Sequence, residues 1–234
     1  MTTHSRPTGA EAAELPHLAL RRAVVDVSVR LRRAGVLSHS GHASLSARIG
    51  PDTVLLTAVS QMHDLGPDDL AVVRLDGAVA EGSLAASNAE IVPMHTEVYR
   101  ARPQVGTVIH THSPNLLVFA LAGRPLPVRY EALLRLGQAE EVPVVPWAPR
   151  GSARSVGGMI ELIRERPGTQ AVLLSNDGVL AFGRDPEAAV SLVVVLEEAA
   201  EAELRAAVLG GAAELPAGAL ADVRTAMARV RPAD

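Results

Sequence analysis

The stretch Thr107-Val-Ile-His-Thr-His-Ser-Pro114 places two histidines, two residues apart, directly after a β-branched run. Such a run predicts a buried strand. Successive side chains of a strand point to opposite faces, so we expect His110 and His112 on the same face, where both imidazoles can bind one metal ion. A bare His-x-His pair is also compatible with packed or solvated histidines, so the surrounding sequence must decide between these interpretations.

The segment before this strand, residues 88–102, predicts an amphipathic helix with Glu90 at its start. Its apolar residues recur at helical spacing, and they are Ile91, Met94, Val98 and Tyr99. A carboxylate at this helix start can reach a metal ion held by the next strand. Glu90 is therefore a candidate for the same site.

Length and composition favour a single domain. With 234 residues, 48% of them hydrophobic, the chain can bury a sizeable core without covalent links. We expect residues 1–15 to form a flexible N-terminal tail and residues 16–234 to form one domain. The absence of cysteine excludes disulfides and zinc–thiolate sites, so histidine and carboxylate side chains must hold any metal.

Charge and hydropathy narrow the range of partners. The net charge is −4, and no basic patch is interleaved with aromatic residues, which disfavours nucleic-acid binding. No segment resembles a signal peptide, and no run approaches the roughly 18 apolar residues of a membrane span. We therefore expect a cytoplasmic protein that acts on a small molecule, without nucleic-acid or membrane partners.

Periodicity and turn residues predict alternating helices and strands. Besides the helix and strand described above, helices are expected at residues 18–34, 115–122, 155–165, 186–209 and 217–230, and strands at 44–49, 53–57, 70–75, 141–146, 171–174 and 179–182. Gly-Pro-Asp turns and the hairpin signal Asp76-Gly77 separate the first strands, which indicates an antiparallel meander. The order of elements predicts an α/β protein.

The motif Asn88-Ala-Glu-x4-His-x3-Tyr-x2-Arg-Pro-x2-Gly-x-Val-Ile-His-Thr-His-Ser-Pro joins the Glu90 helix to the histidine strand. Over roughly residues 18–210, the chain resembles the class II aldolase/adducin family, which includes fuculose-phosphate aldolase. The resemblance implies a three-layer α/β/α sandwich around a mainly antiparallel central sheet. It also implies a homotetramer with active sites between neighbouring subunits and one divalent ion per subunit, typically Zn²⁺, with Mn²⁺ or Fe²⁺ as alternatives.

The same resemblance implies roles for residues at matching positions. His110 and His112 match metal ligands, and Glu90 matches an acid/base carboxylate that can also contact the metal in the empty site. Tyr130 falls where some family aldolases place a tyrosine that donates a proton into a neighbouring subunit's site, although a tyrosine before an apolar helix also suits simple packing. The residues that match the substrate-binding cradle, which holds phosphate in the sugar-phosphate enzymes, are Ser44, Thr57, Ser87 and Asn88.

One departure from the family pattern concerns the third metal ligand. In Leu173-Leu-Ser-Asn-Asp-Gly178, Asp177 stands where the family has a histidine. A carboxylate oxygen still ligates zinc, and a set of two histidines and one carboxylate also suits Fe²⁺ or Mn²⁺. Alternatively, Asn-Asp-Gly is only a tight turn and the third ligand is lost.

A second departure lies at Ala43-Ser44, where family members commonly carry Gly-Asn. This change removes a close backbone approach and an amide donor from the phosphate cradle, and Arg48 or Arg150 is a candidate to compensate. The loop histidines, which either contact an anionic substrate or are solvated, are His39, His42 and His63. We expect a small oxygenated substrate, whether or not it is phosphorylated.

The resemblance implies a metal-dependent carbon–carbon lyase. Such an enzyme cleaves a small hydroxy-carbonyl or sugar-derived substrate by retro-aldol reaction, or decarboxylates it, through a metal-stabilised enediolate. Two alternatives stay open: an iron-dependent oxygenase or epimerase on the same scaffold, and a non-catalytic adducin-like domain. Walker, nucleophile-elbow, zincin and dinucleotide-binding motifs are missing, which disfavours hydrolases, kinases and dehydrogenases.

Overall fold

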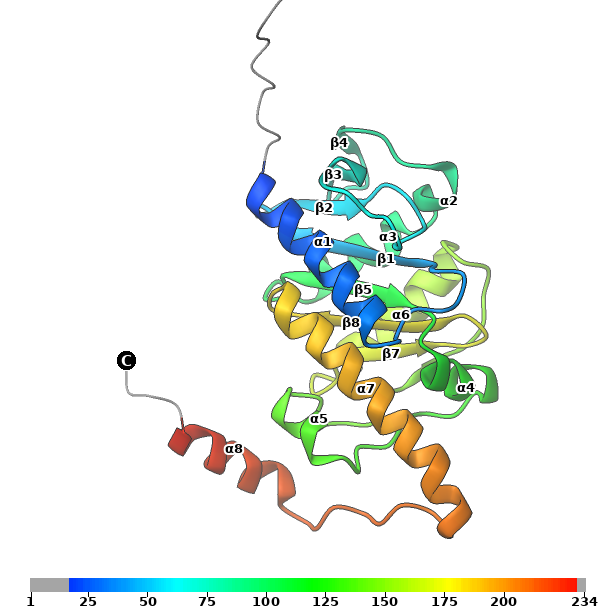
Figure 1. Ribbon diagram of the computed structural model, residues 1–234, viewed down its shortest axis with the longest axis vertical. Helices are drawn as coiled ribbons and strands as arrows, with labels where there is room; N and C mark the ends of the chain where they lie inside the picture. Colours follow the sequence, from blue (N-terminus) through cyan, green and yellow to red (C-terminus); the bar gives the residue numbers. More distant parts are fainter. Residues whose placement is uncertain (1–16, 231–234) are drawn as a thin grey trace, which may run out of the picture.

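An eight-stranded sheet forms the middle of the structure, a computed structural model that describes residues 17–230 (Figure 1). The strands are β1 (Ala43–Arg48), β2 (Thr53–Thr57), β3 (Leu70–Arg74), β4 (Val79–Glu81), β5 (Thr107–Thr111), β6 (Val144–Val145), β7 (Ala171–Leu174) and β8 (Gly178–Gly183). Their order is β4-β3-β2-β1-β5-β8-β7-β6, and only the β6–β7 pair is parallel among these described strands. β5 therefore lies inside the sheet, between β1 and β8.

Helices cover both faces of the sheet, so the predicted three-layer α/β/α sandwich is confirmed. α1 (Leu18–Arg33), α4 (Pro114–Ala122) and α7 (Pro186–Ala206) pack on one face, and α3 (Val92–Ala101) and α6 (Ala153–Glu165) pack on the other (Figure 1). An apolar cluster lies on each side of the sheet. The remaining α-helices are α2 (Ala86–Ala89), α5 (Glu131–Arg135) and α8 (Ala219–Val230), which contacts α5.

Alternation along β5 shows how one strand serves both clusters. Val108 belongs to the cluster under α3 and α6, whereas Ile109 belongs to the cluster under α1 and α7. His110 follows Val108 by two residues, so it points to the α3/α6 face. The sheet thus presents His110 as a buried side chain near the end of an interior strand.

The predicted meander and most predicted helices are present, and two differences have a common cause in proline. The helix predicted at residues 88–102 is divided into α2 and α3, with Glu90 as the C-terminal cap of α2. Pro93 would lose a hydrogen bond and clash with the preceding turn inside a continuous helix, but it is tolerated in the first turn of α3. The strand predicted at 141–146 shortens to β6 because Pro143 and Pro146 flank it and cannot donate to a ladder.

Two further expectations concern the chain as a whole. The predicted tail at residues 1–15 falls outside the described residues, and the division into a tail and one domain stays a prediction. Within residues 17–230, none of the helices has the length and hydropathy that a transmembrane segment requires.

A carboxylate from α7 holds the start of α4 in place. Glu197 is 8% exposed, and its Oε1 accepts hydrogen bonds from the backbone and side-chain nitrogens of Asn115 at 2.7 and 2.8 Å. Its Oε2 accepts one from the backbone N–H of Leu116 at 3.0 Å. These amides belong to a helix N-terminus, where a negative charge is favourable. Because α4 begins two residues after His112, the contact also fixes where the chain goes after leaving β5.

Glu197→Gln should lower the free energy of unfolding by about 1–3 kcal/mol, because the amide turns a donor toward N–H groups that need an acceptor. Urea titration followed by circular dichroism measures this difference. Glu198→Gln, at an exposed neighbouring position of the same helix, is the matched control and should change little. Equal midpoints for the two variants would contradict this account of the α4 N-terminus.

Candidate metal centre

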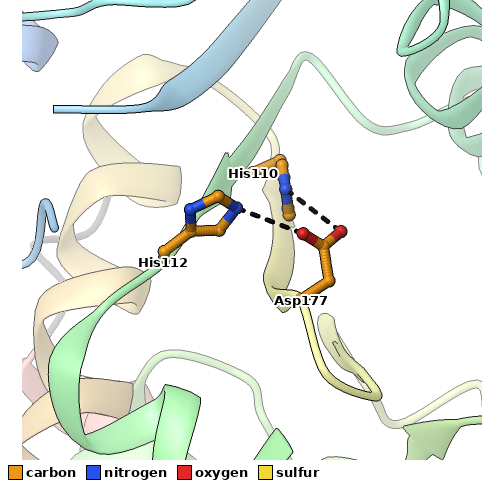
Figure 2. Close-up of side chains that lie close together, drawn as sticks. All are labelled: His110, His112 and Asp177. Carbon is orange, nitrogen blue, oxygen red and sulfur yellow. Dashed lines mark ion pairs between the residues drawn. The ribbon is translucent and has the colours of Figure 1, made fainter. Parts of the chain in front are cut away.

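Three side chains converge where β5 ends and the β7–β8 hairpin turns; Figure 2 shows both imidazoles directed toward one carboxylate. His110 comes from β5, His112 lies just beyond it, and Asp177 comes from the hairpin turn. Nε2 of His112 lies 3.3 Å from Oδ1 of Asp177, and Nε2 of His110 lies 3.6 Å from Oδ2. The structure therefore brings together the three residues that the sequence suggested as ligands.

Two residues allow the β7–β8 turn to approach β5 closely. Asn176 has a left-handed conformation, with φ of 60°, which asparagine tolerates better than most residues. A Cβ atom on Gly178 would lie 2.5 Å from the carbonyl oxygen of Thr111 and 2.8 Å from Cδ2 of His112. Glycine is therefore the residue that lets the turn carry Asp177 up to the histidines.

The two histidines have nitrogen atoms without hydrogen bonds. Nε2 of His110 and Nε2 of His112 are buried, and neither has a hydrogen-bond partner in the described part of the chain, although Asp177 is near. Buried polar atoms without partners are rare and need an explanation such as a bound ion. The ligand atoms of the three residues lie within 4.8 Å of one another. Tetrahedral zinc with bonds of about 2.1 Å separates its ligands by about 3.4 Å, so this donor set fits a divalent ion.

Burial and hydrogen bonding hold His110 and Asp177 in the protonation states that bind metal. Nδ1 of His110 donates to the carbonyl oxygen of Val179 at 3.1 Å, which leaves Nε2 without a proton in the neutral ring. Burial lowers the pKa of His110 to about 4, against the opposing effect of Asp177. Burial alone would raise the pKa of Asp177, but the two histidines and Arg150 together hold it below its usual range. A neutral imidazole and an ionised carboxylate are the forms that ligate.

A cavity of about 90 Å³ adjoins the two histidines. Three of the four predicted substrate-binding residues, Ser44, Ser87 and Asn88, line it together with His110 and His112. The other residues that line it are His42, Ala43, Ser60, Ile91 and Arg150. Two of the predicted metal ligands, His110 and His112, thus share one cavity with most of the predicted cradle.

Thr57, the fourth predicted substrate-binding residue, supports Asn88, which lines this cavity. It is fully buried, and its Oγ1 accepts a hydrogen bond from the backbone N–H of Leu45 at 3.2 Å. Its carbonyl oxygen accepts a hydrogen bond from Nδ2 of Asn88 at 2.9 Å. The carbonyl oxygen of Thr57 therefore helps to orient the side chain of Asn88. Contact of the Thr57 side chain with substrate stays a prediction.

Arg150 brings a positive charge to the site, whereas Arg48 is engaged elsewhere. Arg150 lines the 90 Å³ cavity and also a second cavity of about 250 Å³ beside Asp177. Arg48 donates to the carbonyl oxygens of Pro51 and Val105 at 2.7 and 3.1 Å. Of the two arginines that were candidates to compensate for the changed cradle, Arg150 is the one that lines this cavity.

Glu90 lies beside Arg150 and is more exposed than the sequence predicted. Its side chain is 56% exposed, and its Oε2 is 3.5 Å from Nε of Arg150. A Cβ atom on Gly151 would lie 2.5 Å from the carbonyl oxygen of Glu90, so the Arg150 loop packs directly on the α2–α3 junction. Glu90 is not part of the cluster formed by the three candidate ligands, and its contact with a metal stays a prediction.

Tyr130 lies apart from the candidate metal centre of its own chain. It precedes α5, is 42% exposed, and lines a separate cavity of about 150 Å³ that includes Arg129 and Glu203. A role for Tyr130 in catalysis would require a neighbouring subunit, and it stays a prediction. Of the loop histidines, the cavity beside the metal ligands includes His42 but neither His39 nor His63.

His95 is a candidate that the sequence patterns did not single out. It is fully buried on α3, and its ring nitrogens are hydrogen-bonded to Oγ of Ser44 and Oγ of Ser46 at 2.8 and 2.7 Å. The Glu-x4-His spacing was a visible signal, but a histidine on the apolar face of a helix is more often a core residue. Only the packing of α3 against β1 shows which side chains it meets.

Residues 22–204 match the family model described as Class II Aldolase and Adducin N-terminal domain. The chain belongs to the class II aldolase/adducin family. The resemblance inferred from the motif between Asn88 and Pro114 is therefore confirmed. Matched relatives in this family are named as aldolases, a decarboxylase and an epimerase.

Individual relatives are moderately similar to this class II aldolase family member. A 5-methylthioribulose-1-phosphate/5-deoxyribulose-1-phosphate aldolase from Rhodospirillum rubrum is 28% identical over 184 residues, covering 79% of this chain and 80% of the relative. A 3,4-dihydroxyphthalate decarboxylase from Arthrobacter keyseri is 30% identical over 207 residues, covering 80% and 82% respectively. A solved L-fuculose 1-phosphate aldolase shares the fold with a TM-score of 0.78 at 20% identity, covering 90% of this chain and 96% of that chain.

Asp177→Ala should weaken Zn²⁺ binding by at least about tenfold, because it removes one of the three candidate ligands. Competition with a chromophoric chelator on metal-stripped protein gives the dissociation constants. Asp222→Ala, which removes an exposed carboxylate of α8, is the control and should bind as the wild type does. Unchanged affinity in Asp177→Ala would mean that Asn-Asp-Gly serves only as a turn.

The metal-free protein should lose stability as the pH falls from about 6.5 to about 4. In the unfolded chain, His95 and His110 bind protons near pH 6.5, whereas burial lowers the pKa of His95 to about 3 and that of His110 to about 4. The unfolded state therefore binds more protons across this window, and the folded state loses on the order of a few kcal/mol. Urea unfolding at a series of pH values measures the slope. His95→Gln should flatten it, and an equal slope would show that His95 does not contribute.

Proposed function

We propose that this protein is a metal-dependent carbon–carbon lyase that cleaves or decarboxylates a small, anionic hydroxy-carbonyl compound. The observation that carries the proposal is the pair of buried, unpartnered Nε2 atoms of His110 and His112 beside the Asp177 carboxylate. Arg150 adds a positive charge at the adjoining cavity. Relatives named as an aldolase and as a decarboxylase support this class of reaction.

The proposed cofactor is one divalent ion per subunit, Zn²⁺ first, with Mn²⁺ or Fe²⁺ as alternatives. His110, His112 and Asp177 would hold it, and Glu90 is proposed to contact it when no substrate is bound. When bound, the ion supplies a Lewis acid that stabilises negative charge on a substrate oxygen as the carbon–carbon bond breaks.

Glu90 is the proposed acid/base group, and in this structure its side chain pairs with Arg150. Their side chains are each about half exposed and 3.5 Å apart, so the ion pair contributes little to stability. An anionic group of the substrate can therefore take the place of Glu90 at Arg150. The released Glu90 carboxylate can then accept the proton of a substrate hydroxyl, or return a proton to carbon.

We propose further that the protein is a cytoplasmic homotetramer in which Tyr130 of a neighbouring subunit completes each site. The exposure of Tyr130, at a distance from the ligands of its own chain, supports this arrangement. In this position the phenol would donate a proton to the leaving group. The expected partner is a small-molecule substrate, and neither nucleic acid nor a membrane is proposed.

A second candidate is an iron-dependent oxygenase, because two histidines and one carboxylate form a set that suits non-haem Fe²⁺. An epimerase would use the same residues, and a relative named L-ribulose-5-phosphate 4-epimerase supports it. Elemental analysis of protein purified without an affinity tag separates the lyase from the oxygenase, since zinc favours the lyase and iron favours the oxygenase. A metal-free protein that cannot be reloaded would instead favour a non-catalytic adducin-like domain.

Glu90→Gln should retain metal but lose turnover by about 10²–10⁴-fold, because an amide cannot transfer the proton. Turnover is measured as release of an aldehyde or of CO₂ from a panel of hydroxy-carbonyl phosphates and hydroxy-carboxylates, with metal content determined in the same samples. Glu161→Gln, at an exposed position of α6, is the control. Full activity in Glu90→Gln would place the base elsewhere in the site.

A further inference from the structure

A buried chain of hydrogen bonds runs from the core to the cavity beside the candidate metal centre. Oγ of Ser46 lies 2.8 Å from the hydroxyl of Tyr99 and 2.7 Å from Nδ1 of His95. Nε2 of His95 lies 2.8 Å from Oγ of Ser44. Tyr99, Ser46 and His95 are buried in the core, whereas Ser44 lines the cavity. Together, Tyr99, Ser46, His95 and Ser44 form the Ser44 relay.

The proton on the Tyr99 hydroxyl decides which atom donates in each of these hydrogen bonds. Burial raises the pKa of Tyr99, so its hydroxyl keeps its proton. A buried hydroxyl proton needs an acceptor, and within residues 17–230 the oxygen that receives it is Oγ of Ser46. Ser46 then has its own proton to donate, and Nδ1 of His95 accepts it.

The position of the proton on the His95 ring decides which atom donates in the hydrogen bond between His95 and Ser44. Burial lowers the pKa of His95 to about 3, so the ring is neutral and carries one proton. Because Nδ1 accepts from Ser46, that proton resides on Nε2, which donates to Oγ of Ser44. The hydroxyl proton of Ser44 then has no acceptor inside the relay, and the cavity is the space open to it.

We propose that His95 is a positioning residue that holds Ser44 as a hydrogen-bond donor toward an anionic oxygen of the substrate. In this chain the hydroxyl of Ser44 thereby replaces the amide donor that is lost where family members commonly carry asparagine. The substrate part of the inference rests on the proposed lyase function, whereas the direction of the relay does not. The opposite direction, with Ser44 donating to Nε2, would instead make Ser44 and His95 a nucleophile–base pair.

Nitrogen-15 NMR of histidine-labelled protein, with and without added Zn²⁺, tests the direction. The ring of His95, assigned by the loss of its signals in His95→Gln, should show a protonated Nε2 and an unprotonated Nδ1. Tyr99→Phe keeps the volume of the ring but removes the proton that sets the direction, so it should shift the tautomer toward Nδ1–H. Ser28→Ala, which removes another buried serine hydroxyl outside the relay, should leave the tautomer unchanged. A protonated Nδ1 in the wild type would overturn the proposal.

Binding of glycolate and of inorganic phosphate to the zinc-loaded protein tests the donor role. Ser44→Ala should weaken binding of at least one anion by about tenfold, whereas Ser44→Asn restores a donor and should recover most of the affinity. Equal affinities in the wild type and Ser44→Ala would overturn the donor role. Failure of the wild type to bind either anion would count against both the donor role and the proposed anionic substrate, while the NMR result would still decide the direction of the relay.

Discussion

Burying an imidazole nitrogen without a hydrogen bond costs about 1–3 kcal/mol, and the fold buries two such nitrogens, Nε2 of His110 and of His112, beside one carboxylate, that of Asp177. The pairing of β5 with β1 and β8 fixes the direction of the His110 side chain. The hydrogen bond from Nδ1 of His110 to the carbonyl oxygen of Val179 leaves Nε2 as the ring nitrogen without a proton. Glu197 holds the chain just beyond His112. The surrounding structure therefore keeps the two nitrogens together, and a bound cation would relieve the cost.

The parts of this site that the sequence could predict are those with local signals. A β-branched run marks β5, the two-residue spacing puts His110 and His112 on one face, and Asn-Asp-Gly marks the turn that carries Asp177. Prediction was wrong where proline decided an element's bounds, because the apolar periodicity continues through Pro93 while the helix does not. The spacing of apolar residues shows which face of an element is buried. Where the element begins depends instead on proline, because its backbone nitrogen has no hydrogen to donate.

Other parts of the site depend on contacts between segments far apart in the chain, and no local pattern reveals them. Arg150 meets Glu90 because Gly151 packs on the α2–α3 junction. His95 meets Ser44 and Ser46 because α3 lies on the face of the sheet to which β1 contributes both hydroxyls. Asp177 stands where the family has a histidine, and Ser44 stands where family members commonly have asparagine. At both positions a side chain with a nitrogen donor or ligand is replaced by one that offers only oxygen. With Asp177 in place of a histidine, the candidate ligand set is one unit more negative, which makes the positive charge of Arg150 more important for attracting an anion.

Gly178 makes the candidate metal centre depend on a residue that contributes no ligand atom. Any side chain there would collide with the Thr111 carbonyl and the His112 ring, so the hairpin would have to move away from β5 and take Asp177 with it. The spacing of the ligands is thus set by backbone contact as well as by the ligands' own rotamers. A homologous chain that kept all three ligands but lost this glycine would still look like an enzyme when judged by its ligands alone, and yet its coordination geometry would be disrupted. The glycine is therefore as informative as the ligands when active members of such a family are to be told from inactive ones.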